Sequence, residues 1–136
     1  MHSSPWWEVT SFILQTEKFG LSPDGLPNVV YLTGDTVLTP ELSEIRKRFY
    51  VVIAVMNLGE ARIPLPGYEV PLQITMNGQD AAKLMRELGA DMMVPVHFES
   101  WHHFMQGAEE LRAIFEAEGI ADQICWATPG EKKIIA

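Results

Sequence analysis

The sequence predicts one α/β domain, because short β-rich apolar runs alternate with segments that have helical spacing. The apolar runs predict strands at 9–16, 29–33, 51–56, 92–96 and 123–127. Helices are expected from Pro40 to Arg48, through 77–88 and over 107–118. This alternation is typical of βαβ units, which place a largely parallel sheet beneath their helices.

The first two strands are expected to form an antiparallel hairpin. Gly20, Pro23, Gly25 and Pro27 lie between them and are typical of a turn that returns the chain. The second strand, VVYLT at 29–33, is continuously apolar, as in a strand buried on both faces. The fold class is therefore α/β, with a mixed sheet in which an N-terminal antiparallel hairpin precedes βαβ units.

Capping residues mark the two better defined helices. Thr39 is expected to cap the helix that starts at Pro40. Asn77 is expected to cap the next helix, which Gly89 ends. The long 58–78 stretch that precedes this helix is rich in proline and glycine, and connections of that length are usually functional or mobile.

Composition excludes several classes of partner. With 10 basic and 18 acidic residues the formal net charge is −8, which argues against a nucleic-acid or anionic membrane surface. The single cysteine, Cys125, allows no intrachain disulfide and is expected to be a buried hydrophobic residue. No apolar run is long enough for a membrane span, and no basic stretch followed by an apolar run starts the chain. These features predict a cytoplasmic protein.

Polar side chains follow three of the predicted strands. Asp35, Asn57 and His97 each come just after an apolar run. The carboxyl ends of parallel strands meet at one edge of a sheet, where ligands usually bind. Asp35 and His97 there would offer the oxygen and nitrogen ligands that suit a divalent metal. The alternatives are a turn carboxylate at Asp35 and a core-edge histidine hydrogen-bonded to backbone at His97.

Three segments resemble one known family. YLTGDT at 31–36, VPVHF at 94–98 and WATPGE at 126–131 are similar to the C-terminal half of the metallo-β-lactamase superfamily, particularly its lactonase-like and phospholipase-like hydrolases. The resemblance implies that Asp35 bridges two metals and that His97 binds the second. It also implies that His2 is a further ligand, unless it is a flexible terminal side chain. The metal would be zinc, with manganese or iron as alternatives.

One motif of that family is missing from this chain. The His-x-His-x-Asp-His motif, which in the family lies in an N-terminal half of similar size, does not occur. Residues 1–136 are therefore expected to form one half-domain of a two-sheet αββα sandwich. Its inner sheet face would be uncovered, which predicts a homo-oligomer or pairing with a missing N-terminal half.

A polar and aromatic segment follows His97. Trp101 and His102 are expected to contact a small-molecule substrate, with His102 or His103 as a possible proton donor. Asn57 is expected to line the same opening. The alternative is a loop that its aromatic side chains hold in place.

Two functions follow from these observations. The first is a metal-dependent hydrolase, incomplete as this chain, that acts on an ester, a lactone or a phosphodiester. The alternative is a non-catalytic α/β module that self-associates through its uncovered sheet face. A nucleotide-binding domain ranks last, because no glycine-rich phosphate loop follows the first parallel strand.

Overall fold

The computed structural model describes residues 11–96, 106–128 and 130–134. The elements in chain order are β1 (Phe12–Leu14), η1 (Glu17–Phe19), β2 (Asn28–Leu32), η2 (Pro40–Lys47), β3 (Tyr50–Asn57), β4 (Arg62–Ile63), β5 (Leu72–Gln73), α1 (Gly78–Leu88), β6 (Met92–Val96), α2 (Ala108–Ala117) and η3 (Ala121–Gln123). No helix in these described stretches is both long and apolar enough to pass through a bilayer.

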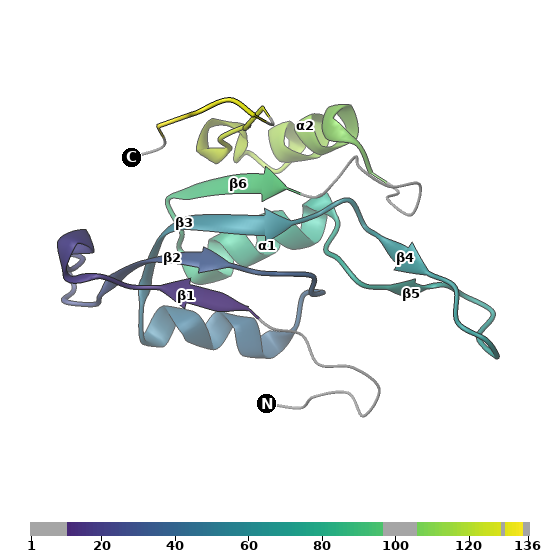
Figure 1. Cartoon of the computed structure of the whole chain (residues 1–136), viewed down its shortest axis with the longest axis horizontal. Coiled ribbons are helices and arrows are strands. Elements are labelled where there is room, and N and C mark those ends of the chain that lie inside the picture. Colours follow the sequence, from purple (N-terminus) through teal and green to yellow (C-terminus); the bar gives the residue numbers. More distant parts are fainter. Residues whose placement is uncertain (1–10, 97–105, 129, 135–136) are drawn as a thin grey trace.

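The main sheet is mixed, as the sequence predicts. Its strand order is β1-β2-β3-β6 (Figure 1). β1 pairs antiparallel with β2, whereas β2 with β3 and β3 with β6 pair parallel. Parallel pairing brings the carboxyl ends of β2, β3 and β6 to one edge of the sheet. β4 and β5 form a separate antiparallel arm that extends away from this sheet.

One face of the sheet packs against α1. In Figure 1, α1 crosses behind the strands. The buried side chains of α1 recur at three- and four-residue spacing and join the hydrophobic core with alternate residues of β2 and β3: Ala81, Leu84, Met85, Leu88, Val29, Tyr31, Val51, Ala54 and Met56. Two further helices, η2 and α2, both contact α1.

The predicted limits of α1 are confirmed. The Asn77 side chain accepts a hydrogen bond from the backbone N–H of Asp80 at 2.8 Å, which caps the helix. Gly89 ends it in the left-handed region at φ 65°. At the first helical residue, Gly78, a Cβ would lie 3.0 Å from Ile114 Cγ2 of α2. The absence of a side chain there lets the two helices approach closely.

Three predictions about local structure are wrong. The 123–127 segment is not a strand, because only an isolated bridge joins Ile124 to Met93 before the chain leaves the sheet. The segment that begins at Pro40 is a 3₁₀ helix, and the Thr39 side chain makes no capping hydrogen bond. The 58–78 stretch, expected as one long loop, contains β4 and β5. Cys125 is buried, as predicted, although it lies outside any strand.

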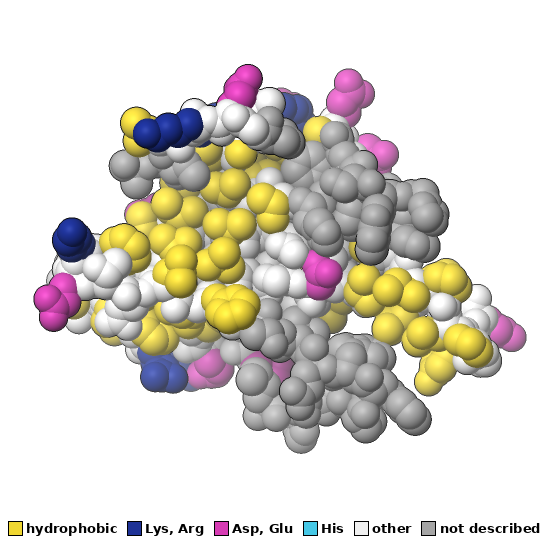
Figure 2. All heavy atoms as spheres, in the orientation of Figure 1, with side chains coloured by type: hydrophobic (Ala, Val, Ile, Leu, Met, Phe, Trp, Pro, Cys, Tyr) yellow, Lys and Arg dark blue, Asp and Glu magenta, His cyan; other side chains and the backbone are white. Residues whose placement is uncertain are grey.

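β2 is buried on one face only, contrary to the prediction. Val29 and Tyr31 are buried, whereas Val30 and Leu32 between them are partly exposed. The strand registers place these two on the same face as four neighbours, which defines the open sheet face: Phe12, Leu14, Val30, Leu32, Ile53 and Val55. Phe12 is 59% exposed and Leu14 is 52% exposed. Figure 2 shows hydrophobic side chains gathered over the strands on this side.

Candidate functional site

Two of the predicted site residues meet at the carboxyl edge of the sheet. Asn57 is the last residue of β3, and Asp35 lies in the turn that follows β2. The side-chain amide of Asn57 donates a hydrogen bond from Nδ2 to Asp35 Oδ1 over 2.7 Å. Asp35 is exposed and Asn57 is half-buried, so the pair combines a solvent-accessible carboxylate with an amide that is anchored in the sheet.

The Thr33 hydroxyl bonds to the backbone on both sides of this pair. Its hydroxyl accepts a hydrogen bond from the backbone N–H of Asn57 at 3.0 Å and donates one to the Gly34 carbonyl at 2.9 Å. The residue is fully buried, and its own N–H bonds to the Val55 carbonyl at 3.0 Å. Thr33 was not predicted as a site residue. In the sequence, Thr33 is marked only by its place at the end of an apolar run. That place does not distinguish a threonine whose hydroxyl supports a site from an ordinary strand residue.

β6 reaches the same edge. Val96 is paired with Asn57 in the parallel register of β3 and β6, and its carbonyl accepts a hydrogen bond from Leu58 N–H at 3.0 Å. Val96 immediately precedes His97 in the chain. The predicted residues His97, Trp101, His102, His103 and His2 all lie outside the described residues.

The 58–61 segment after Asn57 is held by a buried threonine. The Thr75 hydroxyl donates to the Leu58 carbonyl at 3.0 Å and accepts from Ala61 N–H at 2.7 Å. Within this segment Gly59 has φ 95° and Glu60 has φ 50°. Glu60 is the only non-glycine residue with positive φ in the described chain. Such a backbone is strained for a side chain with a Cβ and persists only where its surroundings enforce it.

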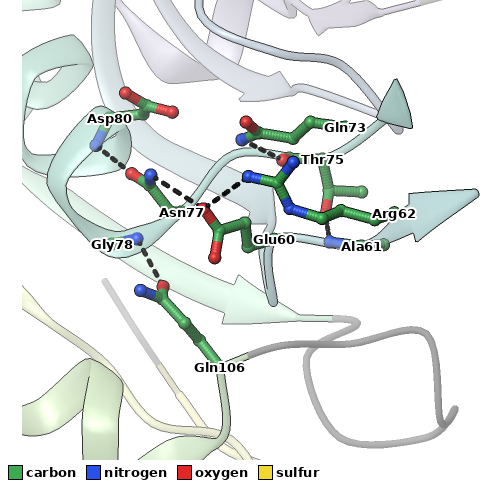
Figure 3. Close-up of polar contacts among 9 residues, drawn as sticks. All are labelled: Glu60, Ala61, Arg62, Gln73, Thr75, Asn77, Gly78, Asp80 and Gln106. Atoms are coloured by element: carbon green, nitrogen blue, oxygen red, sulfur yellow. Dashed lines mark hydrogen bonds and ion pairs between the residues drawn. The ribbon is translucent and has the colours of Figure 1, made fainter. Parts of the chain in front are cut away.

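The Glu60 carboxylate links the β4–β5 arm to α1. Its Oε1 accepts hydrogen bonds from Arg62 Nη2 at 3.2 Å and from Asn77 Nδ2 at 3.4 Å (Figure 3). Asn77 is also the cap of α1. One carboxylate therefore contacts both the first residue of β4 and the start of α1. These two contacts help to hold Glu60 at its positive φ.

Gln106 joins the same network from the C-terminal side. Its Oε1 accepts from Gly78 N–H at 2.9 Å, and its own backbone N–H donates to the Gly59 carbonyl at 3.0 Å. Figure 3 shows Gln106 reaching the first turn of α1. The sequence offered no signal for this contact, because a glutamine before a helix has many possible partners.

The described residues fit a metal site in part. A carboxylate at an exposed sheet edge is a suitable ligand for a divalent cation, and Asp35 is such a group. Within the described ranges no three His, Cys, Asp or Glu side chains come together as a ligand group. Asp35 and its partner Asn57 are thus one portion of a coordination sphere, and the other predicted ligands fall in the residues not described.

Comparison with curated proteins finds metal-dependent hydrolases. No family model matches the chain. A UPF0173 metal-dependent hydrolase of Methanoculleus marisnigri is 26% identical over 113 residues, which cover 83% of this chain and 44% of the relative. A second UPF0173 metal-dependent hydrolase, of Methanopyrus kandleri, is 23% identical over 130 residues, which cover 96% of this chain and 51% of the relative. The chain spans about half the length of these relatives.

Solved structures show the same relationship. The isothiocyanate hydrolase from Delia radicum gut bacteria superposes with a TM-score of 0.65 at 29% identity, covering 76% of this chain and 38% of that one. A possible metal-dependent hydrolase from Veillonella parvula gives a TM-score of 0.63 at 24% identity, over 81% of this chain and 40% of that one.

A third structure identifies the fold by name. A metallo-β-lactamase fold protein from Bacillus subtilis gives a TM-score of 0.52 at 14% identity, over 89% of this chain and 48% of that one. The sheet order, the Asp35 turn and these likenesses agree with one another. The chain has the metallo-β-lactamase fold over about half the length of these proteins, and in sequence it is similar to metal-dependent hydrolases.

Proposed function

We propose that this chain supplies part of the divalent metal site of a hydrolase that acts on an ester, a lactone or a phosphodiester. The observation that carries the proposal is the meeting of Asp35 and Asn57 at the carboxyl edge of the sheet, beside Val96. His97 directly follows Val96 in the sequence, and on that ground it is the nitrogen ligand that we propose for this edge. Metal-dependent hydrolases among the relatives support the same chemistry.

In this proposal Asp35 is a carboxylate ligand, with His97 and His2 as nitrogen ligands. Zinc is the expected metal because it accepts mixed nitrogen and oxygen ligands, and manganese and iron are the alternatives. A divalent metal supplies activated water and stabilises negative charge that develops on the substrate. Trp101 and His102 are proposed to contact the substrate, and His102 or His103 to donate the proton. The remaining ligands would come from another polypeptide segment.

Metal analysis tests the ligand assignment. Protein expressed with zinc, manganese and iron in the medium is expected to retain metal, and Asp35→Ala and His97→Ala are expected to lower the metal content severalfold. Asp122→Ala is the matched control. Asp122 lies on η3, whose Gln123 side chain bonds to Ala90 and Asp91 carbonyls at the opposite end of β6 from Val96. Equal metal content in the Asp35→Ala variant and the wild type would contradict the assignment of Asp35 as a metal ligand.

Hydrolysis assays test the substrate class. The panel contains an aryl ester, a homoserine lactone, a bis-aryl phosphodiester and an alkyl isothiocyanate, the last because one structural relative is an isothiocyanate hydrolase. Turnover that needs metal and is lost in Asp35→Ala supports the proposal. If metal is bound but none of the four is turned over, the metal site stands and the chain by itself is not a hydrolase of these substrates.

The second candidate function is a non-catalytic module that self-associates. The observation in its favour is the open sheet face, where Phe12 and Leu14 are more than half exposed. Sheets with one apolar face pack against another sheet, so a second copy or a separate N-terminal half would cover this one. We propose on this basis that residues 1–136 form a half-domain and assemble as a homo-oligomer or with such a partner.

We also propose a cytoplasmic location. The single cysteine, Cys125, is buried and free in the structure. A reducing compartment agrees with that state. Fractionation of cells that express the tagged chain, with a periplasmic and a membrane marker, would test the location directly.

A further inference from the structure

We propose that Asn57 is a positioning residue that orients the Asp35 carboxylate. The proposal rests on the metal site proposed above. It differs from the role expected from the sequence, in which Asn57 lines the substrate opening. The evidence is the set of hydrogen bonds that hold Asn57 in place and the one that it makes to Asp35.

The backbone of Asn57 is held from two sides. On the β2 side, the buried Thr33 hydroxyl accepts the Asn57 N–H at 3.0 Å. On the β6 side, Asn57 is paired with Val96 in the strand register. The next residue, Leu58, is bonded through its N–H to Val96 and through its carbonyl to Thr75, each at 3.0 Å. Asn57 therefore projects its side chain from a backbone position that the sheet determines.

Asp35, in contrast, lies beyond the end of β2. Gly34, in the left-handed region at φ 63°, takes the chain out of the strand direction just before it. The Asn57 amide connects this turn to the sheet at 2.7 Å. A neutral N–H donor on one carboxylate oxygen restricts the orientation of the carboxylate, and so favours particular directions for the other oxygen. Partners of this kind orient metal ligands in many proteins.

The hydrogen bond from Asn57 to Asp35 also argues against a main role for Asn57 in substrate binding. A bond from an amide to a carboxylate is charge-assisted and stronger than one between neutral groups. A substrate that recruited the same N–H would have to break that bond. The geometry therefore favours Asn57 as a residue that acts through Asp35.

The test is zinc binding by the full chain, with zinc alone as the ligand. Asn57→Leu keeps the size of the side chain but removes the donor, and is expected to weaken zinc binding by at least about tenfold, the usual effect of losing an outer-shell partner. Asn28→Leu is the matched control. Asn28 begins β2 at the opposite end of the sheet, and its amide likewise donates one hydrogen bond, to the Phe19 carbonyl at 2.9 Å. The zinc affinity of the Asn28→Leu variant should stay within about twofold of the wild type.

A second measurement needs no metal. The NMR signals of the Asn57 side-chain NH₂ group are expected to shift when Asp35 is changed to Ala, whereas those of Asn28 stay in place. If the wild type binds no zinc, the proposed metal site fails, and the NMR result alone decides the pairing. Asn57 signals that are insensitive to Asp35→Ala would overturn the positioning role. So would an Asn57→Leu variant that binds zinc as tightly as the wild type.

Discussion

The hydroxyl of Thr33 accepts a hydrogen bond from the backbone amide of Asn57, and this contact joins the ends of β2 and β3 where Asp35 leaves the sheet. Thr33 is fully buried and Asn57 is half-buried, so this N–H depends on the hydroxyl as its acceptor. A side chain just after one strand thus completes the backbone hydrogen bonding of the next. The candidate site depends on a residue that would contact neither metal nor substrate.

Replacing Thr33 by Val should destabilise the protein. The shape is nearly kept, but the half-buried Asn57 N–H loses its acceptor, which costs about 1 kcal/mol. Urea unfolding measures the loss. Thr33→Ser keeps the hydroxyl and should cost about 1 kcal/mol for the missing methyl group. Hydrogen exchange at Asn57 should accelerate in Thr33→Val only, and equal exchange in the two variants would argue against the contact.

The strained backbone at Glu60 allows a paired comparison. Glu60→Ala and Glu60→Gly both lose the carboxylate that Arg62 and Asn77 contact. Only Gly adopts φ 50° without a steric penalty, so Glu60→Gly should be more stable than Glu60→Ala by about 1 to 2 kcal/mol. Thermal unfolding of both variants checks this. Equal stability would mean that the positive φ at this position carries no strain.

Alkaline pH should destabilise the fold through Tyr31. Burial raises the pKa of Tyr31 above its ordinary value of 10.0, partly offset by the hydrogen bond to Ser11. Above pH 10 the unfolded chain therefore loses a proton that the folded chain keeps, so stability is full below pH 10 and falls as the pH rises beyond it. Urea unfolding from pH 7 to pH 11 should show a smaller alkaline loss for Tyr31→Phe.

The alkaline loss should not vanish in that variant. The pKa of Tyr50 is also raised, chiefly by the hydrogen bond that its hydroxyl donates to Asp91, so part of the loss persists. Tyr68→Phe, at an exposed tyrosine of the β4–β5 arm, is the control. If Tyr31→Phe loses as much stability as the wild type between pH 10 and pH 11, the burial argument for Tyr31 is wrong.

Polar substitutions on the open sheet face should reduce self-association. Phe12→Ser with Leu14→Ser removes two apolar side chains that are already more than half exposed, so the monomer should retain most of its stability. Since burial of apolar surface drives association, the dissociation constant should rise at least about tenfold, which sedimentation velocity measures.

The β4–β5 arm supplies the control for this experiment. Tyr68 and Val70 are each 68% exposed but lie away from the open sheet face, so Tyr68→Ser with Val70→Ser should leave association unchanged. A wild-type chain that remains monomeric at micromolar concentration would contradict the self-association proposal.

Regular local patterns in the sequence predicted most of the elements. α1 was predicted with its cap at Asn77 and its end at Gly89, because capping and helix termination depend on residues within a few positions of each other. β3 and β6 were predicted from apolar runs, and the parallel pairing from their alternation with helices. The strand predicted at 123–127 is wrong because an apolar run can also lie beside a sheet through a single bridge.

The sequence by itself determined the α/β class, the mixed sheet and the carboxyl edge at which Asp35 and Asn57 were expected to lie. These follow from hydrophobic periodicity and from the rule that parallel strands end at one edge. Only the tertiary structure decided that Asn57 bonds to Asp35, that Thr33 holds Asn57, and that Glu60 and Gln106 link the 58–61 segment to α1. The physical reason is that each of these contacts joins residues distant in the chain, and a hydrogen-bonding side chain carries no local sign of its partner.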